Sequence, residues 1–386
     1  MPELTEGAAR LLLPDWAGGL GPEKGPGSSR MPVFYNPAMR LGRDLCVLAV
    51  GRMGLSRPLR AVDGLAGSGV RAIRLALETG ARFERLVAND RSPEAFGIIK
   101  ENLRQNGLEG KVEPASSDLG ALLSSERFDY IDVDPFGSPV EFVLAASRAI
   151  RHRGVMGMTS TDTGPLCGTN PSTCLRRYGA VSMRSEHMHE TAARILVGYC
   201  VRQAASLDIG LWPLLAHGSE HYVRVYLRAE RGIRQAEEAL GRLGYLASGR
   251  RTLGLEEGSP VKGRVTGPLW LGPLFDRPFL DGMQKDAGER LTGRALGPAP
   301  PAPLAAGERL WRLLELMREE AQMPPFFHEL DACASEWGTD PPPLKALLEA
   351  LRAAGFRASR THFCPTGFRT DAPADELERL FKSVPG

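Results

Sequence analysis

Long hydrophobic runs are missing from this sequence. No stretch of about 18 or more apolar residues occurs, so no membrane span is predicted. The N-terminal segment carries acidic residues and only one short apolar run, Leu11 to Leu13, which is not typical of a secretory signal. We therefore expect a cytoplasmic protein without membrane attachment.

Paired cysteines and a strong charge of either sign are missing too. None of the six cysteines forms a C-x-x-C pair, and a chain of 386 residues, 42% of them hydrophobic, does not need disulfides to hold its core. The net charge is only +2, so a polyanionic partner would have to be bound by local basic patches. The overall charge neither supports nor excludes RNA.

Residues 60 to 161 alternate between short apolar strands and amphipathic helices. We expect strands at 60–63, 86–88, 111–116, 128–133 and 154–160. The helices between them are expected from Val70 to Gly80, from the N-cap Ser92 through Asn106, and from Phe142 to Ile150. This alternation predicts a parallel sheet covered by helices on both faces.

The sheet is expected to end differently. A long helix at 186–206 leads to a strand at 209–211 and then to the alternating run 221–228. No helix fits between the two strands, so they should pair antiparallel. The expected fold class is therefore α/β, a Rossmann-like sheet of the class I methyltransferase type with an antiparallel last strand.

The C-terminal part differs from the first part in composition and in its expected elements. Residues 296–307 are rich in proline, alanine and glycine, which argues against regular structure there. Beyond them we expect helices at 308–320 and 343–353 and a strand at 357–363. These elements predict a smaller α/β domain at 266–386, after a first domain at 1–265.

A glycine-rich turn with acidic neighbours predicts a nucleotide-containing cofactor. Gly67 and Gly69 allow a strand to turn sharply into a helix beneath a ligand, and Asp90 ends the next strand, where it can bind ribose hydroxyls. The same spacing fits a nicotinamide dinucleotide. Asp63 favours S-adenosylmethionine, because its carboxylate suits the methionine ammonium and would repel a pyrophosphate.

A second loop is expected at the same sheet edge. Asp134, Pro135 and Phe136 follow the fourth strand, and ligands of open α/β sheets bind beyond the carboxyl ends of strands. A carboxylate there can orient an exocyclic amine, and an aromatic ring can stack a base. Asp118 follows the third strand, where it is either a contact to the adenine amine or a solvated loop residue.

An ordered set of motifs extends from about residue 33 to 373. The motifs are Phe34-Tyr35-Asn36-Pro37, Arg43-Asp44, the Gly67/Gly69 turn, Asn89-Asp90, Asp134-Pro135-Phe136-Gly137, Thr161-Asp162-Thr163, His221-Tyr222 with Arg224-Val225, Gly267-Pro268-Leu269-Trp270, Gly272-Pro273-Leu274, Ser359-Arg360-Thr361-His362-Phe363 and Pro365-Thr366-Gly367. Together they resemble the tRNA guanine-26 N2-dimethyltransferase family of archaea and eukaryotes.

The resemblance implies transfer of one or two methyl groups from S-adenosylmethionine to the N2 of guanine 26 in tRNA. It implies that Arg43, Arg71, Asp90 and Asp118 bind the cofactor. It also implies that Asp134 holds the guanine amine while Phe34 and Phe136 enclose the base, with Pro135 beside them. Family members often carry a four-cysteine zinc site, but residues 229–266 contain neither cysteine nor histidine, so we expect no zinc or other metal.

Basic residues cluster near the C-terminus. Arg357, Arg360, His362 and Arg369 alternate with phenylalanines, so we expect the second domain to bind tRNA through them. Solvated arginines on a helix–strand unit are the alternative. No obligate protein partner is predicted. A nicotinamide-dependent oxidoreductase and a non-catalytic tRNA-binding relative remain as alternative functions.

Overall fold

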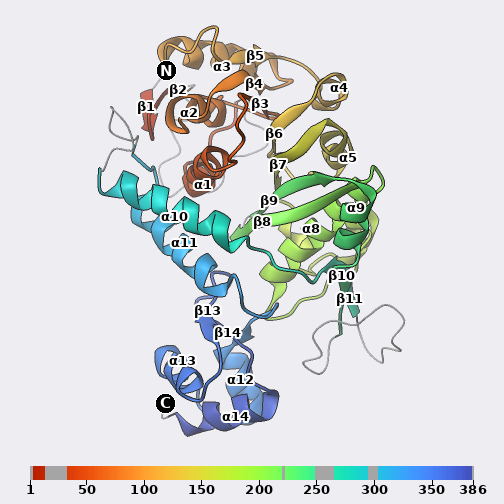
Figure 1. Cartoon of the computed structure of the whole chain (residues 1–386), viewed down its shortest axis with the longest axis vertical. Coiled ribbons are helices and arrows are strands. Elements are labelled where there is room, and N and C mark those ends of the chain that lie inside the picture. Colours follow the sequence, from red (N-terminus) through yellow and green to blue (C-terminus); the bar gives the residue numbers. More distant parts are fainter. Residues whose placement is uncertain (1–2, 14–32, 220–221, 248–264, 294–302, 385–386) are drawn as a thin grey trace.

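A seven-stranded, mostly parallel sheet forms the centre of the protein (Figure 1). The computed structural model describes residues 3–13, 33–219, 222–247, 265–293 and 303–384. The strand order is β5-β4-β3-β6-β7-β9-β8. The strands are β3 (Leu59–Asp63), β4 (Phe83–Asn89), β5 (Glu113–Ala115), β6 (Phe128–Val133), β7 (Ile150–Ser160), β8 (Ile209–Ser219) and β9 (Tyr222–Arg231). The predicted fold class is confirmed.

The last strand that the chain adds to this sheet, β9, is antiparallel to its neighbours, as expected. β9 lies between β7 and β8 and pairs antiparallel with both, so that Thr159 of β7 faces Arg224. The expected strands at 111–116 and 209–211 differ in length from β5 and β8. His221, expected to begin β9, lies outside the described residues.

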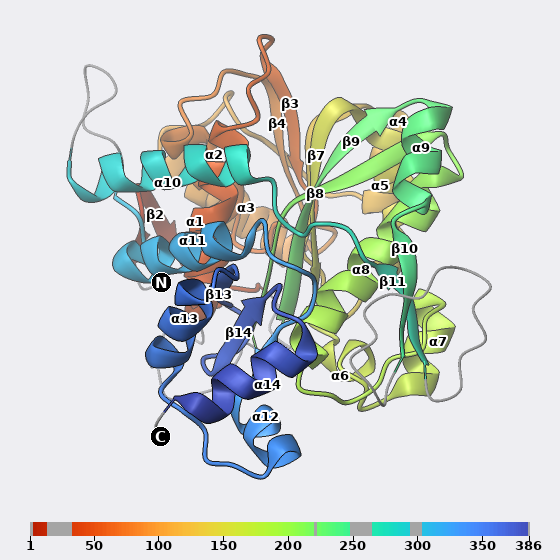
Figure 2. The same cartoon turned by 60° about the horizontal axis from the view of Figure 1, so that its bottom comes forward.

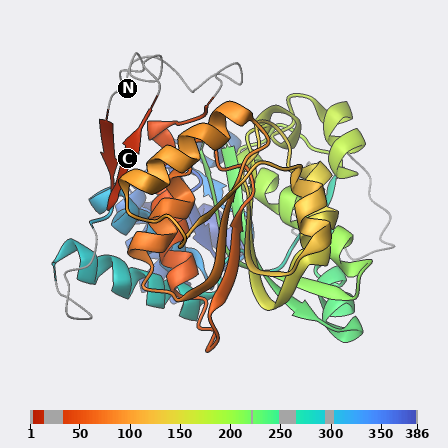
Figure 3. The same cartoon turned by 90° about the horizontal axis from the view of Figure 1, so that it is seen from above.

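Helices cover both faces of the sheet, which runs between them in Figure 3. One layer has α1 (Arg40–Gly51), α2 (Val70–Glu78) and α3 (Pro93–Gln105). The other has α4 (Leu119–Ser125), α5 (Val140–Ala149), α8 (Met188–Ala205) and α9 (Ile233–Leu240). The short α6 (Thr163–Leu166) and α7 (Pro171–Tyr178) precede α8. None of the described helices is long and apolar enough to span a membrane.

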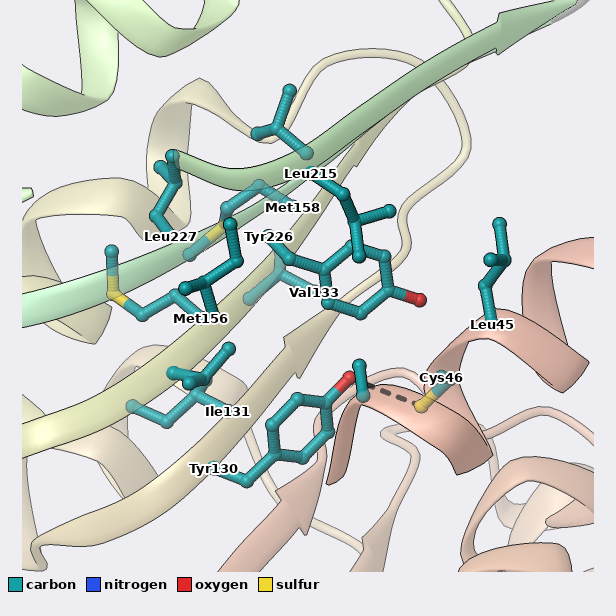
Figure 4. Close-up of a cluster of buried hydrophobic side chains, with 14 of the residues drawn as sticks. Leu45, Cys46, Tyr130, Ile131, Val133, Met156, Met158, Leu215, Tyr226 and Leu227 are labelled. Carbon is teal, nitrogen blue, oxygen red and sulfur yellow. Dashed lines mark hydrogen bonds between the residues drawn. The ribbon is translucent and has the colours of Figure 1, made fainter. Parts of the chain in front are cut away.

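The core between α1 and the sheet combines apolar and polar side chains (Figure 4). Tyr130 of β6 points toward α1, where its hydroxyl lies 3.1 Å from the Cys46 sulfur. Leu215 and Tyr226 of β8 and β9 extend this core across the antiparallel strands. Because helices cover both faces of the sheet, even the polar side chains of β6 and β9 are mostly buried here.

An N-terminal hairpin, which was not predicted, packs beside α2 and α3. Its strands are β1 (Glu3–Glu6) and β2 (Ala9–Leu12). Glu6 is buried and accepts two hydrogen bonds of 2.6 Å from Arg43 and one of 2.7 Å from the Tyr35 hydroxyl. Arg74 adds a fourth contact at 3.0 Å. The hairpin is therefore attached to α1 and α2 through one buried carboxylate.

The elements from residue 328 onward form a second, smaller layer, the C-terminal layer, at the bottom of Figure 1 and at the front of Figure 2, and four other elements come before it in the sequence. β10 (Leu243–Ala247) and β11 (Val265–Trp270) make a separate ribbon, followed by α10 (Arg277–Leu291) and α11 (Gly307–Glu320), which pack on α1. The final elements are β12 (His328–Glu329), α12 (Leu330–Trp337), α13 (Leu344–Ala353), β13 (Ala358–Arg360), β14 (Gly367–Thr370) and α14 (Ala374–Ser383).

Two hydrophobic clusters divide the chain. The larger cluster includes side chains from α10 and α11, whereas the smaller one begins at Leu330 and ends at Phe381. The expected strand at 357–363 is reduced to the three residues of β13, which pair with β14. A domain division at residues 265/266 stays a prediction.

A buried ion cluster joins the C-terminal layer to the sheet domain. Arg369 of β14 is only 2% exposed and donates 2.8 Å hydrogen bonds to Glu190 of α8 and to Glu320 of α11. The ring of His362 is also enclosed and contacts Glu320. Burial alone would raise the pKa of Glu190, but Arg369 and Arg194 outweigh it and hold that pKa at about 2.

This burial corrects the expectation that Arg369 and His362 contact RNA. A guanidinium enclosed by two carboxylates cannot reach a phosphate, so these two side chains belong to an internal ion cluster instead. Arg357 and Arg360 are exposed, and Arg357 pairs with Asp371 at 2.7 Å.

Replacement of Arg369 tests the cohesion of the two layers. Arg369→Met should lower the free energy of unfolding by about 3–5 kcal/mol, because it leaves Glu190 and Glu320 buried without their shared cation. The exposed Arg360→Met is the control and should stay within about 0.5 kcal/mol of the parent protein. Equal denaturant midpoints for the two variants would contradict the assigned role of the cluster.

Candidate active site at the carboxyl edge of the sheet

Three acidic residues lie where neighbouring parallel strands end. Asp63 is the last residue of β3, Asp90 follows β4 and Asp134 follows β6. Because β3 pairs with both β4 and β6, these three positions share the carboxyl edge of the sheet. The sequence-based grouping of Asp63, Asp90 and Asp134 therefore corresponds to one place in the fold.

The glycine-rich turn is held by backbone and side-chain hydrogen bonds. Gly67 and Gly69 have φ values of +54° and +79°, which glycine adopts without strain. Asp90 accepts a 2.9 Å hydrogen bond from the Gly67 N–H, and a Cβ on Gly67 would lie 2.8 Å from the Phe34 carbonyl oxygen. The segment that contains Phe34 thus lies directly against this turn.

Arg71 contacts three acidic side chains at this edge of the sheet. Its side chain is 8% exposed, and its Nε lies 3.2 Å from Asp132 and 3.8 Å from Asp63. Its Nη2 donates to the Asp134 carboxylate. One guanidinium therefore contacts three carboxylates from the ends of two adjacent strands.

The charges of this group are unequal. Burial raises the pKa of Asp63 to about 7, and Asp132 and Asp134 add to this effect while Arg71 opposes it. Burial also acts on Asp132, but Arg224 and Arg71 outweigh it and keep the pKa of Asp132 below its usual value. Asp63 can therefore exchange a proton near neutral pH.

Asp132 and Arg224 were not predicted as site residues. Arg224 is 1% exposed on β9, and it donates to Asp132 and, at 2.6 Å, to the Thr159 hydroxyl. The Tyr130 hydroxyl donates to the same carboxylate. The sequence did contain one indication of Asp132, since alternation along a strand places it on the same side as Asp134.

The loop after β6 brings the two predicted aromatic residues together. Phe136 is 50% exposed, and its ring contacts the edge of Phe34 with centroids 4.7 Å apart and an angle of 81° between planes. Pro135 is buried, and the Gly137 N–H donates a 2.6 Å hydrogen bond to the Thr161 hydroxyl. A base between two rings needs about 7 Å, two contacts of about 3.5 Å each, so the rings are closed against each other here.

Two other predicted residues have structural partners of their own. Arg43 is buried, pairs with Glu6 and donates a 3.0 Å hydrogen bond to the Asn36 carbonyl oxygen. Asp118 is exposed and caps α4 by accepting a 2.9 Å hydrogen bond from the Ala121 N–H. Their expected contacts with a cofactor stay predictions.

The donors and acceptors around Arg71 fit the polar end of an amino-acid-containing cofactor. Three buried atoms here have no hydrogen-bond partner in the described part of the chain: Asp63 Oδ2, Ser68 Oγ and Arg71 Nη1. A carboxylate oxygen suits an ammonium group, whereas the hydroxyl and the guanidinium N–H suit a carboxylate. Within the described ranges, no cluster of three or more histidine, cysteine or acidic side chains could hold a metal ion.

Comparisons with known proteins agree with this chemistry. A family model described as N2,N2-dimethylguanosine tRNA methyltransferase matches residues 22–382. A tRNA (guanine(26)-N(2))-dimethyltransferase of Thermococcus kodakarensis is 38% identical over 402 residues, covering 99% of each chain. One of Methanothermobacter thermautotrophicus is 35% identical and covers 100% of this chain and 99% of its own.

A solved structure is similar over nearly the whole length. It is Trm1 from Pyrococcus horikoshii in complex with S-adenosyl-L-methionine. The TM-score is 0.84 at 32% sequence identity, and the match covers 98% of this chain and 99% of that one.

The contact between Phe34 and the glycine-rich turn can be tested with two matched alanines. Gly67→Ala and Gly69→Ala both place a side chain at positive φ, which costs about 1–2 kcal/mol. Only Gly67→Ala also meets a backbone oxygen at 2.8 Å, whereas the Gly69 position meets the Ile99 side chain at 3.4 Å. Gly67→Ala should therefore lower the thermal unfolding midpoint further, and the reverse order would contradict this packing.

Proposed function

The chain belongs to the N2,N2-dimethylguanosine tRNA methyltransferase family, and from this premise we propose which of its residues perform the reaction. The protein transfers methyl groups from S-adenosylmethionine to the exocyclic N2 of guanine 26 in tRNA. One observation carries the residue assignment: Asp134 directly follows β6 at the edge that also bears the Gly67 turn, and the next residue but one is the half-exposed Phe136. One or two methyl groups are transferred to each guanine.

The proposed cofactor site surrounds the ends of β3 and β4. Asp63 would bind the methionine ammonium and Arg71 the methionine carboxylate, since their unpartnered atoms have the matching chemistry. Each Asp90 oxygen accepts one backbone hydrogen bond, from Gly67 and from Ser92, and keeps a lone pair for a ribose hydroxyl. Bound S-adenosylmethionine supplies the methyl group on an electrophilic sulfonium.

Asp134 is the proposed catalytic residue. The lone pair of guanine N2 is delocalised into the ring, so the amine is a weak nucleophile. A carboxylate that accepts a hydrogen bond from the amine orients it and stabilises the positive charge that develops as the new N–C bond forms. The proton that leaves N2 can then pass to this carboxylate.

The base is proposed to stack on Phe136. Base–aromatic stacking contributes about 1–3 kcal/mol per base, and half of the Phe136 side chain is already accessible. Phe34 contacts this ring edge-on, so Phe34 has to move aside before the two rings can enclose a base. The parent protein should therefore bind tRNA with an abasic site at position 26 more weakly than intact tRNA. The Phe136→Leu variant should bind the two tRNAs equally.

Arg357 and Arg360 stay proposed contacts to the tRNA body, and Arg360 is the one that can be tested without breaking the pair of Arg357 with Asp371. Arg360 is exposed, and it lies on β13, outside the large core. Arg360→Met should reduce the slope of log affinity against log salt concentration by about one. An unchanged slope in filter-binding titrations would remove Arg360 from the RNA interface.

A cytoplasmic location stays a prediction.

Labelled S-adenosylmethionine and an unmodified tRNA transcript test the function directly. Nucleoside analysis should give N2-methylguanosine and N2,N2-dimethylguanosine, and both should disappear when guanine 26 is replaced. Binding of tRNA without methyl transfer would instead indicate a non-catalytic relative. Methylation that persists without guanine 26 would show a different target.

The Asp134→Ala variant should lose at least about 10²-fold in the rate of a single turnover, by analogy with loss of one transition-state hydrogen-bonding group. Asp286→Asn is a suitable control, because Asp286 of α10 pairs with Arg52, the C-cap residue of α1, away from the carboxyl edge. Near-parental turnover in Asp134→Ala would exclude Asp134 from the chemical step.

Cofactor binding should release a proton from Asp63. With a pKa of about 7 in the free protein, Asp63 is mainly protonated below pH 7 and must ionise to bind an ammonium. Affinity for S-adenosylhomocysteine should therefore rise about tenfold per pH unit below 7 and level off above it. Calorimetric titrations of Asp63→Asn should show weaker, nearly pH-independent binding; a parental pH profile in that variant would contradict the assignment.

A further inference from the structure

Arg71 contacts the proposed catalytic carboxylate directly. Its Nη2 donates to Asp134, whereas its Nη1 is buried and has no partner among the residues that the structure describes. The Asp134 side chain is 11% exposed, so this contact is largely shielded from water. An Asp134 engaged in this way offers less acceptor capacity to a guanine amine.

The Nε end of the Arg71 guanidinium is held by Asp132. Arg71 Nε lies 3.2 Å from Asp132, and Asp132 is bound on its far side by Arg224 and by the Tyr130 hydroxyl. Arg224 is itself held by Thr159 at 2.6 Å. Since these groups are buried and mutually paired, only the Nη end of Arg71 can exchange partners.

A ligand carboxylate suits that Nη end. Arginine binds carboxylates through two parallel N–H donors, and here Nη1 is unpartnered while Nη2 points to Asp134. A carboxylate that takes both donors would displace Asp134, and repulsion between the two anions acts in the same direction.

We propose that Arg71 is shared between Asp134 and the carboxylate of the bound cofactor, so that cofactor binding releases Asp134 to accept the guanine amine. Asp132 and Arg224 act as positioning residues that keep the guanidinium in reach of both partners. The proposal rests on the proposed function in one respect, the assignment of Asp134 as the acceptor of the guanine amine. Productive tRNA binding then follows cofactor binding, because the acceptor is free only in the cofactor complex.

The test compares two ligands that differ in a single group. S-adenosylhomocysteine has a carboxylate, and its decarboxylated analogue keeps the amine without it. The ratio of their affinities isolates the carboxylate contribution from those of the adenosine and the ammonium. Asp134→Asn removes the competing charge with little change in shape, so the ratio should rise about three- to tenfold in favour of S-adenosylhomocysteine.

Two further variants complete a double-mutant cycle. Arg71→Gln should bring the two affinities close together, and Asp134→Asn should have no further effect on the ratio when Arg71 is already replaced. Asp286→Asn, in the distant pair with Arg52, should leave the ratio at the parental value. If Arg71→Gln does not fold, the result for Asp134→Asn alone decides.

A ratio in Asp134→Asn within twofold of the parental value would overturn the proposal, as would a rise that persists in the Arg71→Gln background. These binding measurements require no turnover. A raised ratio together with full turnover in Asp134→Ala would show that Arg71 is shared but that Asp134 has no catalytic role. An unchanged ratio together with lost turnover in Asp134→Ala would show that Asp134 is catalytic but that Arg71 is not shared.

Discussion

The pairing of Asp132 with Arg71 and Arg224 is the interaction on which the site depends. An ionised carboxylate without exposure to water, in the central strand β6, is stable only when cations and hydrogen-bond donors surround it. Arg71 comes from the helix after the glycine-rich turn and Arg224 from the antiparallel strand. The fold therefore has to bring these elements together before Asp132 can be buried as an anion.

The same constraint recurs at the other buried carboxylates. Glu6 attaches the N-terminal hairpin to α1 and α2, and Glu190 with Glu320 attaches the C-terminal layer to α8 and α11. In each case, arginine supplies several donors in a fixed planar arrangement, which allows one side chain to satisfy two acidic groups. Removal of one partner leaves an uncompensated charge, so these clusters make the relative positions of the layers specific.

The framework of the sheet could be predicted from the sequence because it depends on local patterns. Apolar strands, Ser92 as an N-cap and the alternation in β9 are each visible within about ten residues, and strand ends place Asp63, Asp90 and Asp134 at one edge by topology alone. The N-terminal hairpin was missed because its two strands of four residues carry too little pattern to be recognised.

The partners of the arginines could not be predicted in this way. Arg369 resembles a surface residue in a basic, aromatic stretch, yet its carboxylates come from residues 49 and 179 positions away. Arg43 likewise depends on Glu6, 37 residues earlier. Whether a basic side chain is a surface contact or a buried counterion is decided by tertiary partners, and a single sequence contains no local pattern for them.

The charge balance of the site explains why one arginine faces three acids. S-adenosylmethionine brings a sulfonium, an ammonium and a carboxylate, so the site has to stabilise two positive charges and one negative charge in a largely enclosed space. Under the proposed assignment, Asp63 loses its proton to match the ammonium, and Asp132 stays ionised because Arg224 and Arg71 outweigh its burial. Arg71 is then the cation that the carboxylate requires. Under the sharing that we propose, the cofactor carboxylate replaces Asp134 at the Nη end of Arg71, while Asp132 stays paired with its Nε.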